Sequence, residues 1–256
     1  VGIQNLRGTE PWMLQLLSPI IAHFNSAIFI DIGANLGQTL IKLRSISKEV
    51  EYYGFEPNPV CCFYLEELIK SNRFQRTAIF PVAIGGAEAN IVSLFIHNSH
   101  DSADSSATTL KDFKNENISI TKNISIFPLQ FIYEKFLLNK DISVIKIDVE
   151  GAEMEAIQGA LSVIAKIQPF VTVELLPPIN EITRTKVLKQ KTELQEMMLG
   201  VNYECYKIIK NKDNMLKGLK KVYDLAEETL LCEGWDYLFV PKSKREFATI
   251  SFTILN

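Results

Sequence analysis

The residues with the clearest chemical potential form a glycine turn directly after an apolar stretch. Residues 27–32 are mostly apolar and include Asp31, and Gly33 and Gly37 follow as a helical pattern begins near Leu36. This order indicates a buried strand, a tight turn and the start of a helix. Glycine permits a sharp turn and close approach to a ligand, and a helix start offers N–H groups. The stretch therefore predicts a site for a nucleotide-like ligand at the carboxyl end of a strand.

Two ligand classes compete for this turn. A dinucleotide turn reads G-x-G-x-x-G, so counted from Gly33 it requires glycine at positions 35 and 38. The chain has Asn35 and Gln38 there, and Asp31 would sit awkwardly beside a pyrophosphate. A carboxylate is compatible with the ammonium and sulfonium groups of S-adenosylmethionine. The turn favours S-adenosylmethionine, and an NAD-dependent oxidoreductase on a similar sheet is the alternative.

A second acidic residue, Glu56, ends the apolar stretch over 51–56. It follows the glycine turn by about 20 residues, where a ribose diol lies in both ligand classes. A carboxylate can accept hydrogen bonds from both ribose hydroxyls. Glu56 therefore indicates an unphosphorylated ribose, but it does not separate the two cofactors.

A third group of charged residues surrounds a strand predicted over 142–148. Lys146 and Asp148 are two residues apart, so their side chains share one face of the sheet. A lysine in an apolar strand needs a partner or must reach the strand end. Two roles stay open for Lys146. It orients or deprotonates an acceptor hydroxyl together with Asp148, or it forms a structural ion pair while Glu150 serves a helix N-terminus. For Asp148 the site role is favoured.

Other polar residues carry weaker signals. Glu174 ends a strand predicted over 169–175, and with Asp148 it could hold a hard divalent cation. No third ligand is evident, so we predict no metal and expect Glu174 to be a hydrogen-bonded rim residue. His97 and His100 flank a polar loop and are candidate general bases, although a histidine beside such a loop is more often simply exposed.

Together these segments resemble the FkbM family of S-adenosylmethionine-dependent methyltransferases. The resemblance runs from about residue 27 to 176 and is carried by residues 29–37, 54–59, 82–85, 145–153 and 170–174. It implies a class I methyltransferase with S-adenosyl-L-methionine as cofactor. The implied reaction is O-methylation of a hydroxyl on a sugar, glycan, polyketide or other small metabolite. A non-catalytic S-adenosylmethionine-binding module is a further alternative.

The resemblance also implies roles for individual residues. Gly33 and Gly37 would allow close approach of the cofactor, and Glu56 would hold the ribose. The catalytic candidates are Asp148, Lys146 and Glu150. The cofactor-binding candidates are Asp31, Gly33, Ala34, Asn35, Gly37, Gln38, Thr39, Glu56, Pro57, Asn58, Ala83, Ile84 and Asp148.

The elements that must position these residues alternate between strand and helix, which predicts an α/β fold with a three-layer Rossmann-like, mostly parallel sheet. We expect one methyltransferase domain over 1–256, with an N-terminal helix at 11–25, a cofactor-binding core over 27–176 and a C-terminal part over 180–241. The alternation breaks at an inserted, antiparallel β segment near 90–128. The remaining predicted strands cover 27–32, 51–56, 77–84, 142–148 and 169–175, with an antiparallel pair at 202–209 and 235–241.

Composition excludes several function classes. The 256 residues are 47% hydrophobic and carry a net charge of -3, which gives no electrostatic footprint for nucleic acid. No apolar run is long enough to predict a membrane span. Four cysteines without a C-x-x-C pair indicate thiols in a reducing compartment, so we expect a cytoplasmic protein. The chain starts at Val1 rather than Met, as a segment of a longer protein would. The oligomeric state cannot be deduced from the sequence.

Overall fold

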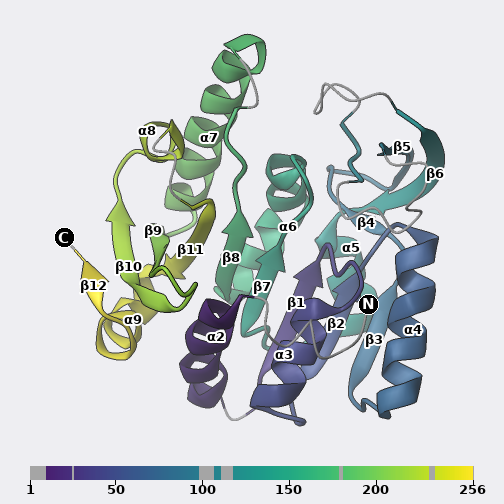
Figure 1. Ribbon diagram of the computed structural model, residues 1–256, viewed down its shortest axis with the longest axis horizontal. Helices are drawn as coiled ribbons and strands as arrows, with labels where there is room; N and C mark the ends of the chain where they lie inside the picture. Colours follow the sequence, from purple (N-terminus) through teal and green to yellow (C-terminus); the bar gives the residue numbers. More distant parts are fainter. Residues whose placement is uncertain are drawn as a thin grey trace.

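A large twisted sheet runs through the protein and carries strands from both halves of the chain (Figure 1). The computed structural model describes residues 10–24, 26–97, 107–110, 118–178, 181–230 and 234–255. Within these residues the strand order is β12-β10-β9-β11-β8-β7-β1-β2-β3. The parallel part comprises β1 (Ile28–Ile32), β2 (Glu51–Phe55), β3 (Thr77–Phe80), β7 (Val144–Ile147) and β8 (Phe170–Glu174). The other strands are β9 (Tyr203–Lys210), β10 (Leu216–Val222), β11 (Asp236–Pro241) and β12 (Ile254–Leu255).

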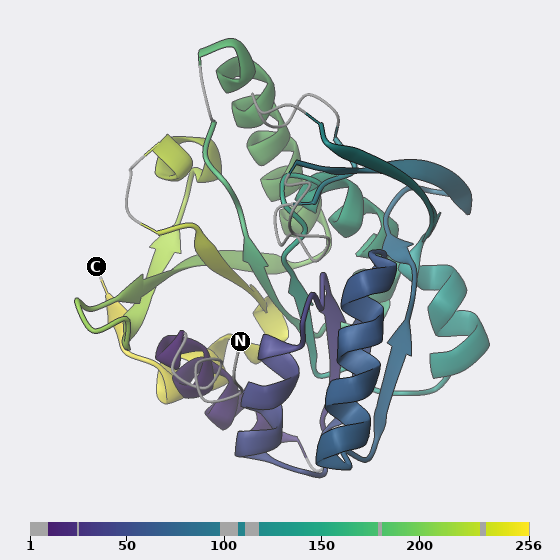
Figure 2. The ribbon, with the colours of Figure 1, turned by 45° about the vertical axis from the view of Figure 1, so that its right-hand side comes forward.

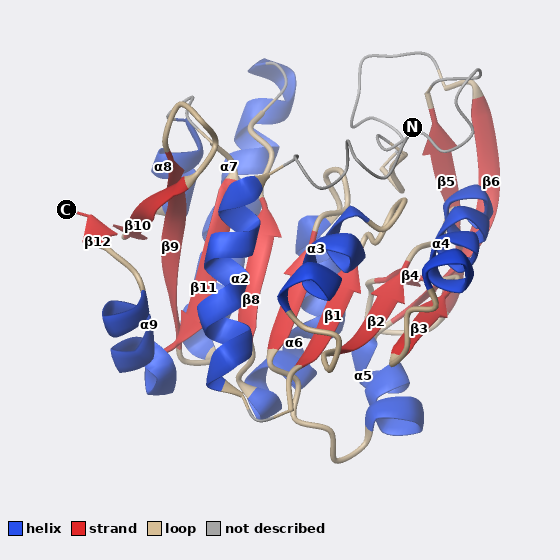
Figure 3. Cartoon of the chain, turned by 60° about the horizontal axis from the view of Figure 1, so that its bottom comes forward, coloured by secondary structure: helices blue, strands red, loops and turns tan. Residues whose placement is uncertain are grey.

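Helices cover both faces of this sheet, giving the predicted three layers (Figure 3). One face packs against α2 (Pro11–His23), α3 (Gln38–Ile46), α4 (Pro59–Asn72) and α9 (Arg245–Ser251). The other packs against α5 (Leu129–Ile132), α6 (Glu153–Ile167), α7 (Glu181–Gly200) and α8 (Leu225–Leu230). On β1 the residues Ile28, Ile30 and Ile32 enter one hydrophobic cluster and Phe29 enters the other. Because both faces are covered, a continuous apolar run forms this central strand.

A smaller sheet, β4-β6-β5, forms the insertion that the sequence predicted. Its strands are β4 (Ala83–Ile84), β5 (Asn90–Ile96) and β6 (Ile120–Phe127), and β5 pairs with β6 in the antiparallel sense. The expected single strand over 77–84 is wrong. β3 ends at Phe80, Pro81 cannot donate a ladder hydrogen bond, and the chain leaves the large sheet so that β4 pairs with β6.

The C-terminal part confirms one expectation and corrects another. β11 pairs antiparallel with β9, as predicted, and also with β8. The charges of the lysine-rich segment 207–221 predict a solvated surface, and Lys212 and Lys217 are exposed, but the segment also contains the end of β9 and most of β10. Lys207 is only 2% exposed and pairs with Glu228, its Nζ lying 3.1 Å from Oε1. The strand is not evident from the sequence, because lysines usually indicate contact with water, whereas the ammonium of Lys207 is compensated by its ion pair with Glu228.

Two helical segments also differ from expectation. The sequence predicts a single helix over 129–138, but the structure has the short α5 followed by a π-helical turn, Tyr133–Leu137. Proline inside a helix predicts a kink or a split at Pro19, and the structure shows no split, because α2 continues from Pro11 to His23. No helix in the described part of the chain has the length and apolarity to cross a membrane.

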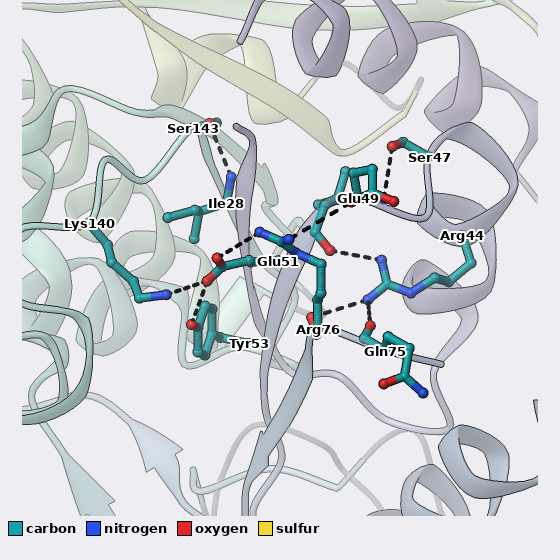
Figure 4. A network of polar contacts seen from close by, with 11 residues as sticks. Ile28, Arg44, Ser47, Glu49, Glu51, Tyr53, Gln75, Arg76, Lys140 and Ser143 are labelled. Carbon is teal, nitrogen blue, oxygen red and sulfur yellow. Dashed lines mark hydrogen bonds and ion pairs between the residues drawn. The ribbon is translucent and has the colours of Figure 1, made fainter. Parts of the chain in front are cut away.

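A polar network holds the amino ends of the central strands, away from the glycine turn (Figure 4). Glu51, the first residue of β2, accepts hydrogen bonds from Lys140 and from the Tyr53 hydroxyl at 2.8 Å. Arg76 donates to its other oxygen at 3.0 Å. Arg44 of α3 donates to the backbone oxygens of Val50 and Gln75, both at 2.9 Å. The network thus fixes β2 against the segments on both of its sides.

This network gives a stability prediction. The hydrogen bond from Lys140 lowers the pKa of Glu51, so its contribution is present above the unfolded-state pKa and is lost as pH falls through the lower folded value. We expect Glu51→Gln to lower the free energy of unfolding by about 1–2 kcal/mol at pH 7. The difference from wild type should shrink as the pH is lowered below 4.

Urea unfolding followed by circular dichroism measures both quantities. Glu67→Gln is the control, since Glu67 forms an exposed helical pair with Lys70 and should change the free energy by less than about 0.5 kcal/mol. Equal losses for the two variants would contradict a special role for Glu51.

Candidate active site

A cavity of about 800 Å³ lies where the parallel strands end and the inserted sheet begins. We call it the first chamber. The residues that follow β1, β2, β7 and β8 line one side of it, and residues of β4, β5 and β6 line the other. Its position outside the carboxyl ends of parallel strands is the one at which open α/β sheets bind their ligands. Its size is that of a site for a nucleoside-sized molecule.

The glycine turn after β1 is closely packed. Gly33 has a φ of +86°, and a Cβ atom there would lie 1.9 Å from the backbone oxygen of Asp148. The backbone nitrogens of Gly33 and Ala34 both donate to the oxygen of Phe55, at 3.0 and 3.1 Å. Only glycine therefore fits at position 33, because the turn presses against the end of β7 while it is tied to the end of β2.

Glu56 is held by backbone donors from two segments. Asn35, with a φ of +47°, donates its N–H to Oε2 at 2.9 Å, and Asn58 donates its N–H to Oε1 at 2.7 Å. The carboxyl group is 7% exposed and lines the first chamber. Burial raises its pKa to about 7, although these two hydrogen bonds act in the opposite direction. Each oxygen keeps a lone pair that a ligand hydroxyl can use.

The other predicted cofactor-binding residues divide into two groups. The first group lines the first chamber and comprises Ala34, Gln38, Thr39, Pro57, Ala83 and Ile84. The second group lies behind the lining and comprises Asp31, Gly37 and Asn58. A Cβ at Gly37 would lie 2.7 Å from Leu68 and 2.8 Å from Leu65, so this glycine lets α4 approach the turn. Asn58 caps α4 by accepting the N–H of Val60, and positions Glu56.

Lys146 joins two of the predicted carboxylates. Its Nζ lies 2.9 Å from Oδ2 of Asp148 and 3.6 Å from Oδ1 of Asp31. Asp31 and Lys146 are paired in register on β1 and β7, and Asp31 is fully buried under the hydroxyl of Tyr52, which donates at 2.6 Å. Burial opposes the charge on Lys146, but Asp148 and Asp31 outweigh it and raise the pKa of Lys146. Lys146 therefore forms a structural ion pair and also lines the first chamber.

Asp148 and Glu174 are neighbouring carboxyl groups whose pKa values are shifted in opposite directions. Asp148 is 37% exposed, and the ammonium of Lys146 outweighs burial and lowers its pKa. Burial, and after it the charge of Asp148, raises the pKa of the neighbouring Glu174 to about 8. A side-chain hydrogen bond joins the two carboxyl groups. Near neutral pH Glu174 thus carries a proton and Asp148 carries the charge.

The remaining candidates are placed as follows. Glu150, with a φ of +48°, lines the first chamber next to Asp148. His97 is buried, 8% exposed, and lines neither of the larger cavities, and His100 lies outside the described residues. Within the described ranges no group of three or more His, Cys, Asp or Glu side chains is arranged to hold a metal ion.

Comparison with protein families adds the deciding observation. Residues 31–205 match the model of the methyltransferase FkbM domain. The chain belongs to the FkbM methyltransferase family. It is therefore a methyltransferase domain whose methyl donor is S-adenosylmethionine, and the nicotinamide alternative is set aside. No match was found among curated proteins.

Several solved structures resemble this FkbM domain in fold. A methyltransferase FkbM from Methylobacillus flagellatus KT is 20% identical over 59% of this chain, with a TM-score of 0.42, and only 33% of that chain is covered. A putative caffeoyl-CoA O-methyltransferase from Staphylococcus aureus is 11% identical, with 90% and 82% of the two chains covered and a TM-score of 0.48. An S-adenosylmethionine-dependent O-methyltransferase from Thermotoga maritima is 12% identical, with 90% and 64% covered and a TM-score of 0.42.

The first chamber of the FkbM domain fits the cofactor. The turn after β1 lines the chamber, and beside it Glu56 presents a carboxylate fixed by two backbone N–H groups. Gln38 and Thr39 line the chamber at the start of α3, whose positive dipole end suits a carboxylate. The individual contacts to the cofactor stay predictions.

Sequence reasoning missed several residues of the chamber. Glu10 lines it from the start of α2 and accepts from Nζ of Lys42 at 2.9 Å. Cys61, Glu88 and Glu155 also line it, together with residues 107–110. No motif marks these positions, because they come from segments far from the strand ends. A single glutamate or cysteine gives no periodic signal in the sequence.

Gly33→Ala tests the packing of the turn. The new Cβ would overlap the backbone oxygen of Asp148, so we expect a loss of stability of at least about 4 kcal/mol or no folded protein. Urea unfolding measures the change. The control is Gly200→Ala at the end of α7, where no atom lies within 4 Å of the added Cβ. It should leave stability unchanged or raise it by up to about 1 kcal/mol. A folded, stable Gly33→Ala variant would refute this packing.

Glu56→Gln tests the ribose contact. Ligand hydroxyls donate to the ionised carboxylate, so in wild type the affinity for S-adenosylhomocysteine should fall by about tenfold per pH unit below the raised pKa of about 7. The variant should bind about 1–3 kcal/mol more weakly at pH 8, and its affinity should hardly change with pH. Calorimetry at pH 6 to 8 measures both, with Glu66→Gln on the exposed side of α4 as control. Parallel pH curves for wild type and variant would remove Glu56 from the ribose site.

Proposed function

We propose that this domain methylates a hydroxyl oxygen on a sugar, a glycan or another small metabolite. The observation that carries the proposal is the position of Asp148, whose carboxylate lies on the wall of the first chamber 2.9 Å from Nζ of Lys146. A hydroxyl is a weak nucleophile until its proton is removed, and a carboxylate in contact with it can accept that proton.

The residues around Asp148 suit this role. Lys146 fixes the carboxylate through a hydrogen bond of 2.9 Å and is itself held by the buried Asp31. Glu174 donates a hydrogen bond to Asp148 while it is protonated, which stabilises the charge before the reaction. The new carbon–oxygen bond would form at the expense of the donor's methyl–sulfur bond. The hydroxyl becomes strongly acidic as it is alkylated, so its proton passes to Asp148 although the ammonium lowers the pKa of that carboxylate. Glu150 lines the same wall and helps to shape the acceptor position.

S-adenosylmethionine, when bound, supplies a methyl group activated by a positive sulfonium. The chain's own contribution is to bind and align the two reactants, which supplies a large part of the rate acceleration of such a displacement. Gln38 and Thr39 would hold its carboxylate end and Glu56 its ribose. Pro57, Ala83 and Ile84 would flank the adenosine.

The proposal also covers the setting of the reaction. Residues 1–256 would act as one methyltransferase domain in the cytoplasm. The acceptor would be a small molecule or a glycan rather than a nucleic acid, in keeping with the net charge of -3. The described cysteines Cys61, Cys62 and Cys205 are thiols, which supports a reducing compartment.

Asp148→Asn tests the proton acceptor. We expect the turnover number to fall by about 10²–10⁴-fold, as is typical when a general base is removed, while S-adenosylhomocysteine affinity changes far less. The assay follows tritium transfer from labelled S-adenosylmethionine into fractions of a cell extract. Label that survives mild alkali indicates an ether and not a methyl ester.

Asp224→Asn is the matched control, because Asp224 caps α8 by accepting the N–H of Glu227 outside both larger cavities. It should transfer label like wild type. Full activity in Asp148→Asn would remove Asp148 as the base. Cofactor binding without transfer to any fraction would favour the non-catalytic module.

A further inference from the structure

A second cavity, of about 680 Å³, lies between the inserted sheet and α7, next to the amino end of α6. We call it the second chamber. Figures 1 and 2 show α7 and the inserted strands rising beyond the strand ends of the large sheet. Its walls are mainly apolar, with Phe95 from β5, Met154 from α6 and Leu194 from α7. Val92 and Leu110 line both chambers, so the two chambers are neighbours.

One ammonium group is buried in the wall of the second chamber. Lys191 of α7 is 5% exposed and lines this cavity. Its Nζ lies 3.9 Å from Oε2 of Glu153, which is too long for a hydrogen bond. The side chain makes no hydrogen bond to any residue that the structure describes. An ammonium that is mostly removed from water and has no hydrogen-bond acceptor among the described residues is poorly compensated, so an acceptor atom brought by a ligand would be stabilised there.

The charges near Lys191 restrict what that partner can be. Glu153 is 3% exposed and balances the ammonium, while its other oxygen accepts the N–H of Gly151 at 2.8 Å. Glu155 lines the first chamber and also acts electrostatically on Lys191. Its Oε2 is buried without a hydrogen-bond partner among the described residues. The other lysine that lines the chamber, Lys186, is exposed, so at the buried Lys191 an anionic ligand group would face Glu153 and Glu155 with one ammonium, whereas a neutral oxygen adds no charge.

We propose that the second chamber binds the body of the methyl acceptor, and that this acceptor is an uncharged, hydrophobic molecule whose carbonyl or hydroxyl oxygen accepts a hydrogen bond from Lys191. The inference rests on the proposed hydroxyl methylation and narrows its substrate class. A free sugar carries hydroxyl groups on all sides and would lose hydration against Phe95, Met154 and Leu194. A ring or chain with few oxygens matches the mainly apolar walls and the buried Lys191 donor.

The test uses 2-naphthol, a neutral fused ring with one hydroxyl group and a fluorescence that reports binding. Titrations are made with saturating S-adenosylhomocysteine present. We expect Lys191→Met to weaken naphthol binding by about tenfold or more, the effect of losing a hydrogen bond to a charged group. Val187→Trp, which fills the second chamber from α7, should abolish it. Affinity for S-adenosylhomocysteine, measured by calorimetry, should stay the same in both variants.

Two further variants control for charge and folding. Lys189→Met changes an exposed lysine of the same helix, paired with Glu193, and should bind naphthol like wild type. The double variant Lys191→Met/Glu153→Gln also removes the carboxylate that faces Lys191 and should bind naphthol as weakly as Lys191→Met. Retained binding of S-adenosylhomocysteine shows that each variant is folded.

The outcomes separate this inference from the proposed function. Equal naphthol affinity in wild type, Lys191→Met and Val187→Trp would overturn the second chamber as the acceptor site, as would no naphthol binding at all. Tighter binding of 2-naphthoate than of 2-naphthol would overturn the uncharged acceptor. Absence of any alkali-stable labelled product would instead contradict hydroxyl methylation, and the naphthol titrations would still decide whether the chamber binds an apolar ligand.

Discussion

The ammonium of Lys146, buried between Asp31 and Asp148, is the interaction on which the site depends. A charge inside an apolar sheet is tolerated only when it is paired, and here the register of β1 against β7 sets the pair. The ammonium keeps Asp148 ionised, and the charge of Asp148 in turn helps to keep Glu174 protonated. The ion pair and burial together thus set the protonation states of Asp148 and Glu174. Fold stability and site chemistry cannot be varied independently at this position.

On the cofactor side of the first chamber, hydrogen bonds join the turn after β1 to the end of β2. Consecutive N–H groups of the turn after β1 bind the end of β2, two of them to Phe55 and the third to Glu56. Backbone geometry therefore aims the Glu56 carboxylate before any ligand arrives, and such preorganisation lowers the entropy cost of binding. The positive φ of Asn35 is local strain that its hydrogen bond to Glu56 maintains, whereas Gly33 adopts its positive φ without strain. Gly37 contributes by packing against α4 and not by touching the cavity.

The inserted sheet gives the domain its individual character. The chain leaves the large sheet at Pro81 to begin this inserted sheet, which forms a wall that both chambers share. Opposite that wall, α7 presents an apolar face with Lys191 buried in it. The general fold thus positions the methyl donor, whereas an insertion and one helix shape the space left for an acceptor. Loops and insertions on a fixed scaffold are where specificity commonly resides.

The sequence by itself determined the family, the positions of the central strands along the chain and the residues at their carboxyl ends. Those features depend on local patterns: apolar runs bounded by Gly33, Pro57 and Glu150 define strands and turns whatever surrounds them. Only the tertiary structure decided that Asp31 and Gly37 lie behind the lining of the first chamber. It likewise decided that Glu174 is hydrogen-bonded to Asp148 and that Lys191 is buried beside a second chamber. It also decided the split at Pro81 and the strand hidden among the lysines of 207–221. Protonation, burial and ion pairing depend on residues brought together from distant segments, and sequence spacing carries no record of those distances.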